Sequence, residues 1–149
     1  MNSFYTFNEL NGLGLASFGN NVLISRKVSI YGAENINIGN NVRIDDFCIL
    51  SGKITICNYV HIASYVALYG GNKGIYIHDF AGISSKSTVY SVTDDYSGEA
   101  MTNPMIPDKY KNVISKEVII ERHALVGAHC LILPALEHKC WNSIQENKK

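Results

Sequence analysis

The sequence has little charge and no excess of either sign. Its 149 residues include 13 Lys and Arg and 13 Asp and Glu, so the formal net charge is zero and only 17% of residues are charged. No run of basic residues is present, which argues against a protein that binds nucleic acid or an anionic membrane surface. A charged fraction this low also indicates that partner subunits cover part of the surface.

Long apolar runs are missing as well. No stretch approaches the roughly 20 apolar residues that span a membrane. The first residues, Met1 to Tyr5, lack the basic and apolar regions of a signal peptide. We therefore expect a soluble, cytoplasmic protein of one domain, with 46% apolar residues to fill its core.

Cysteine occurs four times and never as a CxxC pair. Cys48 and Cys130 fall at positions where the repeat described next places small side chains, and there a thiol packs as a small hydrophobe. We expect reduced structural thiols rather than a disulfide or a metal site.

The sequence does contain a period of six. An aliphatic residue recurs at every sixth position, and a smaller, mostly β-branched residue stands two positions before each one. The first series is Ile38, Ile44, Leu50, Ile56, Ile62 and Leu68, and the second is Ile36, Val42, Cys48, Ile54, Val60 and Val66. Six is a multiple of the two-residue period of a strand but not of the 3.6-residue period of a helix. Three such strands make a coil of roughly 18 residues, so the pattern predicts an all-β chain folded as a parallel β-helix of triangular section.

The unit Ile38-Gly39-Asn40-Asn41-Val42-Arg43 resembles the repeat of the hexapeptide-repeat acyltransferases. This resemblance implies a left-handed β-helix, assembly into a homotrimer, and active sites in the grooves between subunits. The left hand follows from the resemblance alone, because crossovers between parallel strands are usually right-handed.

Interruptions of the repeat divide the chain. Residues 1–20 do not repeat, and we expect them to form a short helical cap on a β-helix that spans residues 21–134. A phase slip predicts a bulge or turn near residues 32–37, and the glycines of residues 69–74 predict a corner loop. Residues 90–117 leave the repeat altogether, which predicts a long, extruded, functional loop.

The repeat is lost again after Pro134, where the next aliphatic residue is due at His138. Members of the resembled family continue with one or two more coils and a C-terminal helix. We expect residues 135–149 to be a non-repeating tail produced by truncation or a frameshift, which leaves the last strands uncapped.

The loop carries two adjacent carboxylates, Asp94 and Asp95. In the sugar and xenobiotic acetyltransferases of the resembled family, this loop shapes the acceptor site and often carries a histidine general base, whereas here it has no histidine. We expect the two aspartates to be the catalytic residues, holding the acceptor or taking its proton if a neighbouring charge raises one pKa. A solvated turn is the alternative, because Asp is a common turn former.

Residues 42–56, 60–63 and 67–71 are similar to the acetyltransferases of nucleotide-linked amino sugars, in particular those that act on dTDP-4-amino-4,6-dideoxyglucose for O-antigen or surface polysaccharide synthesis. A sugar amine of lowered pKa needs no strong base, which is consistent with the missing histidine. The expected substrate-binding residues are His61, Tyr69 and Tyr90. The tyrosines belong to an aromatic set around the glycine corner, with Tyr65 and Tyr76, that stacks on a thymine or sugar ring or packs in a trimer.

Residues 126–134 match the late-coil pattern in which small residues let the pantetheine arm of acyl-CoA lie along a strand. The resemblance makes Gly127, Ala128 and Ala135 the candidate residues for binding acetyl-CoA as co-substrate, with a backbone N–H to stabilise the oxyanion. Plain packing of the coil is the alternative.

Two of the five histidines, His123 and His129, are six positions apart, on equivalent positions of adjacent faces. The γ-type carbonic anhydrases, zinc-binding β-helix trimers of another class, have paired histidines five apart. We therefore expect no metal.

These residues and the resemblance predict an enzyme that transfers acetyl from acetyl-CoA to the amine of a nucleotide-linked deoxyamino sugar. A sugar O-acetyltransferase is one alternative, which a comparison of an amino sugar with its hydroxyl analogue would distinguish. The other is a β-helix that folds and assembles but does not catalyse, because its last coils are absent.

Overall fold

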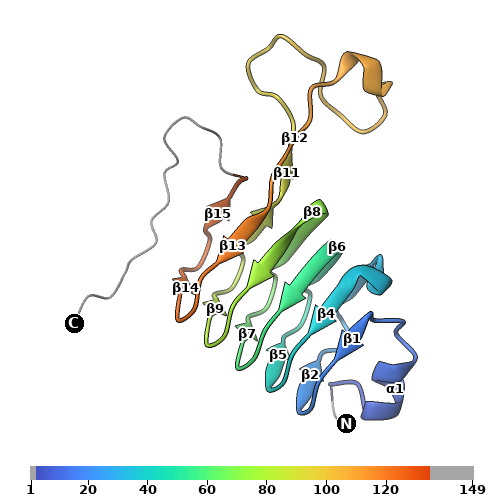
Figure 1. Ribbon diagram of the computed structural model, residues 1–149, viewed down its shortest axis with the longest axis vertical. Coiled ribbons are helices and arrows are strands. Elements are labelled where there is room, and N and C mark those ends of the chain that lie inside the picture. The colour runs from blue at the N-terminus through green and yellow to red at the C-terminus, as the bar shows by residue number, and fades with distance from the viewer. Residues whose placement is uncertain (1–2, 135–149) are drawn as a thin grey trace, which may run out of the picture.

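The computed structural model describes residues 3–134, which form a parallel β-solenoid with almost no helix (Figure 1). One short helix, α1 (Phe7–Asn11), precedes the coils. The strands are β1 (Ser17–Phe18), β2 (Val22–Ile24), β3 (Ser29–Tyr31), β4 (Ile36–Ile38), β5 (Val42–Ile44), β6 (Ile49–Ile56), β7 (His61–Ile62), β8 (Ala67–Ile77), β9 (Gly82–Ile83), β10 (Thr88–Tyr90), β11 (Val92–Thr93), β12 (Ile114–Ser115), β13 (Val118–Ile120), β14 (Leu125–Val126) and β15 (Leu131–Ile132). None of the helices among the described residues is long and apolar enough to cross a membrane.

The strands that build the coils pair in parallel with the strand one coil later, and the pairing registers show where the coils differ in length. Arg43 pairs with His61, which is the spacing that three sixfold repeats predict. The coil before it, in which Val22 pairs with Val42, and the coil after it, in which His61 pairs with Gly82, are slightly longer. Gly82 pairs with Leu125, much further along the chain, because the extruded segment lies between them. The additional residues therefore do not disturb the register of these strands.

Both series of the sixfold repeat point into the core. Every member is at most 3% exposed, from Ile36 and Ile38 at one end to Val66 and Leu68 at the other. Burial of aliphatic side chains in continuous columns is the main stabilising contribution that a solenoid has, since each coil contacts only its neighbours. The predicted fold of hexapeptide coils with a long extruded loop is confirmed.

The corner predicted at residues 69–74 is present, but it is a bend within one strand and not a loop, because β8 continues from Ala67 to Ile77 beside β6, pairing with β10 before the glycines and with β13 after them. The glycines allow these two strands to approach closely. A Cβ on Gly70 would lie 2.0 Å from the backbone oxygen of Lys53, and one on Gly52 would lie 2.7 Å from the backbone nitrogen of Gly71. The extra residues are absorbed as register shifts around Gly52. The phase slip near residues 32–37 is a 3-10 turn, η1 (Ala33–Asn35).

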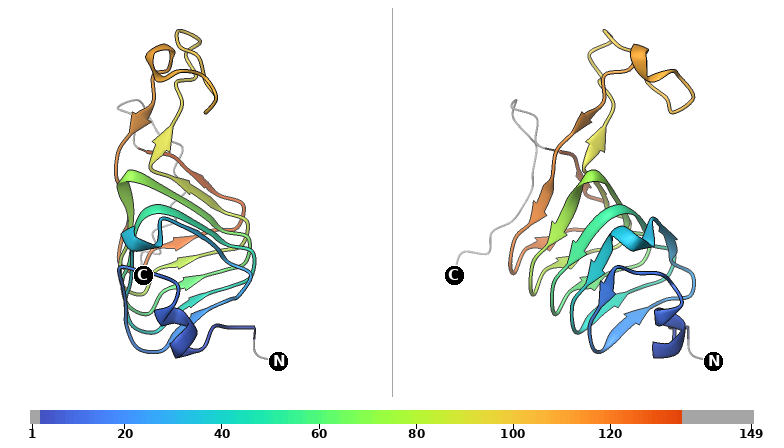
Figure 2. Two further views of the ribbon diagram at one scale, coloured as in Figure 1. Left: turned by 90° about the vertical axis from the view of Figure 1, so that its right-hand side faces the viewer. Right: turned by 45° about the vertical axis from the view of Figure 1, so that its right-hand side comes forward.

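Helix α1 begins at a capping box. The Thr6 hydroxyl accepts a hydrogen bond from the backbone N–H of Glu9, while the Glu9 carboxylate accepts one from the backbone N–H of Thr6 at 2.7 Å. Arg26 binds the same carboxylate at 2.6 Å, and Leu10 is buried against the first coil. The helix therefore lies at the N-terminal end of the solenoid (Figure 2).

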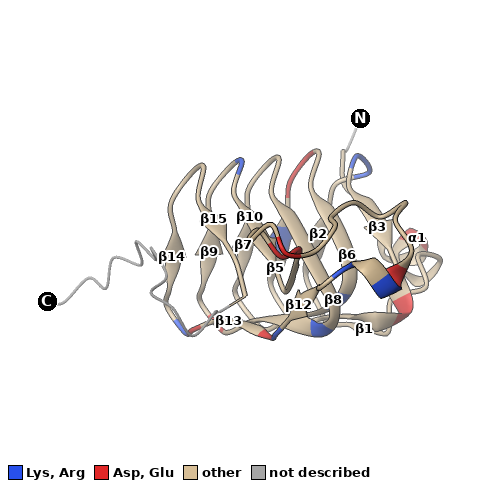
Figure 3. Cartoon of the chain, turned by 90° about the horizontal axis from the view of Figure 1, so that it is seen from above, with Lys and Arg blue, Asp and Glu red and all other residues tan. Residues whose placement is uncertain are grey.

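Residues 90–117 project from the C-terminal half of the solenoid (Figure 2). Their base is an antiparallel ribbon in which β11 pairs with β12, so the segment is not irregular throughout. Beyond the ribbon lies a second 3-10 turn, η2 (Asp108–Tyr110). Charged residues are few on the strands and occur mainly at turns and on the projecting segment (Figure 3).

Candidate functional site

A pocket of about 690 Å³ lies where the projecting ribbon leaves the solenoid. One wall is the outer face of β8, β10 and β15, and the other is the beginning of the ribbon. The residues that line it are Tyr69, Thr88, Tyr90, Leu131 and Leu133 from the outer face, and Val92, Thr93, Asp94 and Tyr96 from the ribbon. Side chains on a strand alternate between core and solvent, so the residues flanking buried Val89 point outward into this space.

Two tyrosines form the flat side of the pocket. Tyr69 and Tyr90 are paired in register on β8 and β10, and their rings stack with centroids 4.8 Å apart and planes 13° apart. Partial burial raises the pKa of Tyr90, with the neighbouring Tyr69 as a further cause, so its hydroxyl stays protonated at neutral pH. The pair presents an aromatic surface with polar ends.

The predicted set of four tyrosines is not one cluster. Tyr65 stacks instead on Phe47 at 5.0 Å, at a corner of the coil, and Tyr76 lies under the ammonium of Lys53 on another face. The four residues do not gather, because β8 bends between Tyr69 and Tyr76 and carries them on different faces of the solenoid.

Two buried serines fix the ribbon and the last coil. Ser91, between β10 and β11, donates a hydrogen bond from its hydroxyl to the backbone oxygen of Gly70. The Ser87 hydroxyl donates to the backbone oxygen of Gly127 at 2.7 Å and accepts from the Cys130 N–H at 3.1 Å. These bonds link neighbouring coils directly beside the pocket.

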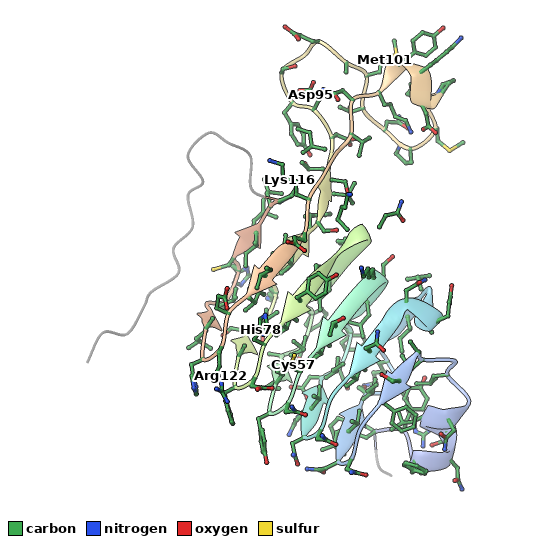
Figure 4. The ribbon with its side chains drawn as sticks, in the orientation of Figure 1. Cys57, His78, Asp95, Met101, Lys116 and Arg122 are labelled. Carbon is green, nitrogen blue, oxygen red and sulfur yellow. The ribbon has the colours of Figure 1, made fainter. Side chains whose placement is uncertain are left out.

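The adjacent aspartates have different surroundings. Asp94 lines the pocket. Asp95 accepts hydrogen bonds from the Ser97 backbone N–H at 2.8 Å and from the Asn112 side chain at 2.9 Å, which joins the two limbs of the projecting segment (Figure 4). These hydrogen bonds, the one from Ser97 first, lower the pKa of Asp95. Asp95 therefore acts as a turn residue, and Asp94 is the carboxylate available to a ligand.

The other predicted site residues lie away from this pocket. His61 lies on β7, on the outer face of a different sheet. Gly127 and Ala128 lie at the corner before β15, and Ala135 and the predicted tail lie outside the described residues. One protomer thus does not bring His61, Gly127 and Ala128 into contact with Asp94.

Around His61 there is a cluster of charged side chains. Its Nε2 lies 2.7 Å from Oδ2 of Asp45, and Arg43 Nε lies 2.7 Å from the other oxygen, Oδ1, of the same carboxylate. Partial burial favours the neutral acid, but the hydrogen bonds from His61 and Arg43 outweigh it and lower the pKa of Asp45. Sequence reasoning missed Asp45, although the sixfold period aligns Arg43 on β5 with His61 on β7, one coil later.

Sequence reasoning also missed Thr88, Thr93, Tyr96, Leu131 and Leu133 as pocket residues. The signal that could have found Thr88 and Leu131 is alternation, since they occupy outward positions on the strands that flank the extruded segment. Among the described residues, no group of three His, Cys, Asp or Glu side chains is arranged to hold a metal ion.

Comparison with known proteins places the chain in a family. It is 46% identical over 129 residues to dTDP-4-amino-4,6-dideoxy-D-glucose acyltransferase of Escherichia coli, a match covering 85% of this chain and 67% of that protein. It also matches AntD, an N-acyltransferase from Bacillus cereus, with a TM-score of 0.88 and 57% identity over 90% of this chain and 72% of that one. No model of a known protein family matches the chain.

The AntD structures include ligands. The D94A variant was solved with dTDP and coenzyme A, and the S84C variant with dTDP-4-amino-4,6-dideoxyglucose and coenzyme A. A further AntD structure, 58% identical to this chain with a TM-score of 0.88 over 90% of this chain and 71% of that one, holds dTDP and 3-hydroxybutyryl-CoA. The fold and the extent of identity define an acyltransferase of the β-solenoid class. The chain belongs to the family of dTDP-4-amino-4,6-dideoxyglucose N-acyltransferases.

Proposed function

We propose that this protein transfers an acyl group from acyl-CoA to the amine of dTDP-4-amino-4,6-dideoxyglucose. The observation that carries the proposal is the position of Asp94, in a pocket beside the stacked rings of Tyr69 and Tyr90. An aromatic surface suits a thymine or sugar ring, and a carboxylate suits the amine of the acceptor. The amine, rather than a hydroxyl, is favoured because both relatives are named for an amino sugar or an N-acyl transfer.

The AntD variants support the role of Asp94. They carry substitutions at an aspartate and a serine, D94A and S84C among them, and this chain has Asp94 and Ser84 at the same two numbers. In this chain Ser84 follows β9 and does not line the pocket that holds Asp94. Residues 85–93 separate the two, and of these residues 88–93 follow β10 and β11, where strand backbone covers roughly 3.3 Å per residue, or roughly 17 Å.

A path of that length along the strands, together with the absence of Ser84 from the lining of the pocket, favours two different protomers as the source of the two side chains. We therefore place the complete site between protomers, with Asp94 from one and the Ser84 corner from the next. A homotrimer gives each protomer two such neighbours and three equivalent sites by symmetry. The low charge of the strands is consistent with faces that pack on another copy.

In the proposed reaction the sugar amine attacks the thioester carbonyl carbon. The C–N bond forms, backbone donors hold the oxyanion, and collapse of the intermediate breaks the C–S bond and releases CoA. Asp94 orients the amine. Gly127 and Ala128 line the path of the pantetheine arm, and a Cβ on Gly127 would meet only Cys130 Sγ at 3.6 Å. Gly127→Val should therefore raise the KM for acyl-CoA without unfolding the protein.

We propose acetyl-CoA as the donor and 3-hydroxybutyryl-CoA as the competing donor. The test is product mass after incubation of the purified chain with each donor and either the amino sugar nucleotide or its 4-hydroxyl analogue. The proposal requires an amide product from the amino sugar. Equal or faster acylation of the hydroxyl analogue would replace it with O-acyl transfer, and a product only from 3-hydroxybutyryl-CoA would overturn the choice of acetyl.

A further inference from the structure

The Arg43–Asp45–His61 cluster lies on the outer face of β5 and β7, away from the pocket of its own protomer. The Asp45 carboxylate is the centre of this cluster. Arg43 and His61 bind opposite oxygens of the Asp45 carboxylate, both at 2.7 Å. Asp45 is 16% exposed, whereas the His61 side chain is 55% exposed, so the carboxylate is held inside and the imidazole reaches outward.

This arrangement fixes the tautomer of the neutral imidazole. An ionised carboxylate only accepts hydrogen bonds, so Nε2 of His61 carries the hydrogen that it donates to Asp45. Nδ1 then has a free lone pair, and the described part of the chain offers it no hydrogen-bond partner. An outward-facing imidazole nitrogen, oriented by a carboxylate on the opposite nitrogen, is the arrangement in which histidine accepts a proton.

The residue aligned with His61 in the next coil is a glycine. His61 pairs in register with Gly82, which has no side chain, and the next residue in that row is Leu125. A Cβ on Gly82 would lie 3.3 Å from Leu125 Cδ1, so the Leu125 side chain packs closely over this glycine. The row on this face therefore runs from His61 over the bare backbone of Gly82 to Leu125.

Ser84 lies near His61 on the same side of the coil. It lies two positions beyond Gly82, just past the strand next to His61, and Ile83 between them is buried. A strand spacing of about 4.8 Å and two residues of about 3.3 Å each place the Cα atoms of His61 and Ser84 about 8 Å apart. The imidazole thus lies at the corner where we place the second half of the shared site.

We propose that His61, oriented by Asp45, accepts the proton of the sugar amine in the site that it shares with Asp94 of a neighbouring protomer. The inference rests on the proposed acyl transfer. When the amine nitrogen bonds to the thioester carbon, one N–H bond breaks and its proton moves to Nδ1 of His61. The imidazolium then gives that proton to the departing CoA thiolate, so the products are the amide and the free thiol. His61, on the outer face of β7, thus provides the general base that the loop lacks.

The charged groups that face His61 come from β5 and the residue after it, namely Arg43 and Asp45. The neighbouring strand β9 (Gly82–Ile83) contributes no titratable side chain.

His61→Gln is the test, with Asp45→Asn as the second variant and His78→Gln as the matched control. His78 lies on a different corner of the coil (Figure 4), and no role is assigned to it. We expect His61→Gln to lower kcat at least about 100-fold with KM for both substrates within about threefold, since general base catalysis contributes about 100- to 10,000-fold. The acid limb of kcat/KM should disappear in His61→Gln. Asp45→Asn should lower kcat by a smaller factor, because it removes the orientation of the ring.

The results distinguish a failure of the proposed function from a failure of this inference alone. If the wild-type protein forms no amide with either donor, the proposed function fails and this inference with it. If the wild-type protein is active and His61→Gln keeps kcat within about threefold and the same pH profile, only this inference fails. A fall in the thermal midpoint without a change in kcat would make the cluster a surface ion network and would also overturn it.

Discussion

The rings of Tyr69 and Tyr90 lie nearly parallel, with centroids 4.8 Å apart, although they belong to successive coils of the chain. The insertion in β8 lengthens the coil between them, yet the register brings both tyrosines to the same row on the outer face. The stack is the aromatic wall of the pocket that contains Asp94.

Removing one ring of the stack should weaken substrate binding. Tyr90→Ala is expected to raise the KM of the nucleotide sugar about tenfold, because an aromatic contact contributes about 0.5–1.5 kcal/mol beyond its buried area. Tyr90→Phe retains the ring and should stay within about threefold. Tyr31→Ala, in the same row of the face but outside the pocket, is the control in steady-state kinetics. An unchanged KM in Tyr90→Ala would rule out stacking on the substrate.

Substitutions at Asp94 and Asp95 should have different effects, the first on kcat and the second on the stability of the projecting segment. Asp94→Asn should lower kcat about 100-fold or more at an unchanged thermal midpoint, since Asp94 lines the pocket and orients the amine. Asp95→Asn removes the charged acceptor that binds Ser97 and Asn112. It should speed limited proteolysis of residues 94–113 and alter kcat less than Asp94→Asn does. The reverse pattern would exchange their roles.

A site shared between protomers predicts complementation. Asp94→Ala and His61→Gln proteins, each with little activity alone, should regain activity when they are co-expressed. At equal amounts, about a quarter of the sites receive both native residues in a symmetric assembly. Light scattering of the mixed sample would establish the trimer. Recovery no greater than the sum of the separate variants would contradict a site built from two protomers.

Acid stability should depend on Asp79. This residue ends a row of stacked amides at one corner: the Asn58 backbone N–H and side chain donate to Asp79 Oδ1 at 2.9 and 3.1 Å. The bond from the Asn58 backbone is the largest influence on the Asp79 pKa, and it lowers the value against the opposing effect of desolvation, with Arg122 contributing in the same direction. A folded pKa below the unfolded one means stabilisation that is complete above about pH 4 and lost as the pH falls through the lower, folded value.

Asp79→Asn keeps an oxygen acceptor for Asn58 and removes the titration. Its thermal midpoint, followed by circular dichroism from about pH 7 to pH 3, should fall less steeply than that of the wild-type protein. Parallel curves for the two proteins would mean that Asp79 does not contribute to the acid sensitivity.

The sixfold repeat could be predicted from sequence because aliphatic residues recur at a fixed spacing. Each aliphatic column from Ile36 to Leu68 is buried as the spacing requires, including Cys48 among the small residues. The extruded segment could be predicted for the same reason, since it is where the period stops. The glycines at positions 70 and 71 were misread because the same residue type permits both a turn and a close approach of two strands.

The site could be predicted only in part. Asp94 and Tyr90 lie at the start of the extruded segment and Tyr69 lies at the glycine interruption before it, and these breaks in the period made all three visible as candidates. Asp45 could not be recognised as a candidate from the sequence, because its contact with His61 depends on the alignment of two coils and not on a local motif. The separate environments of Asp94 and Asp95 depend on Asn112, which returns to Asp95 from the far limb of the projecting segment.

Amide formation by the purified chain tests the central claim most directly. The chain is incubated with acetyl-CoA and dTDP-4-amino-4,6-dideoxyglucose, and free CoA thiol and product mass are followed together. Our account predicts thiol release that depends on the amino sugar, a nucleotide sugar heavier by one acetyl group, and loss of both in Asp94→Asn. No thiol release and no amide from a protein that is folded by circular dichroism would contradict it.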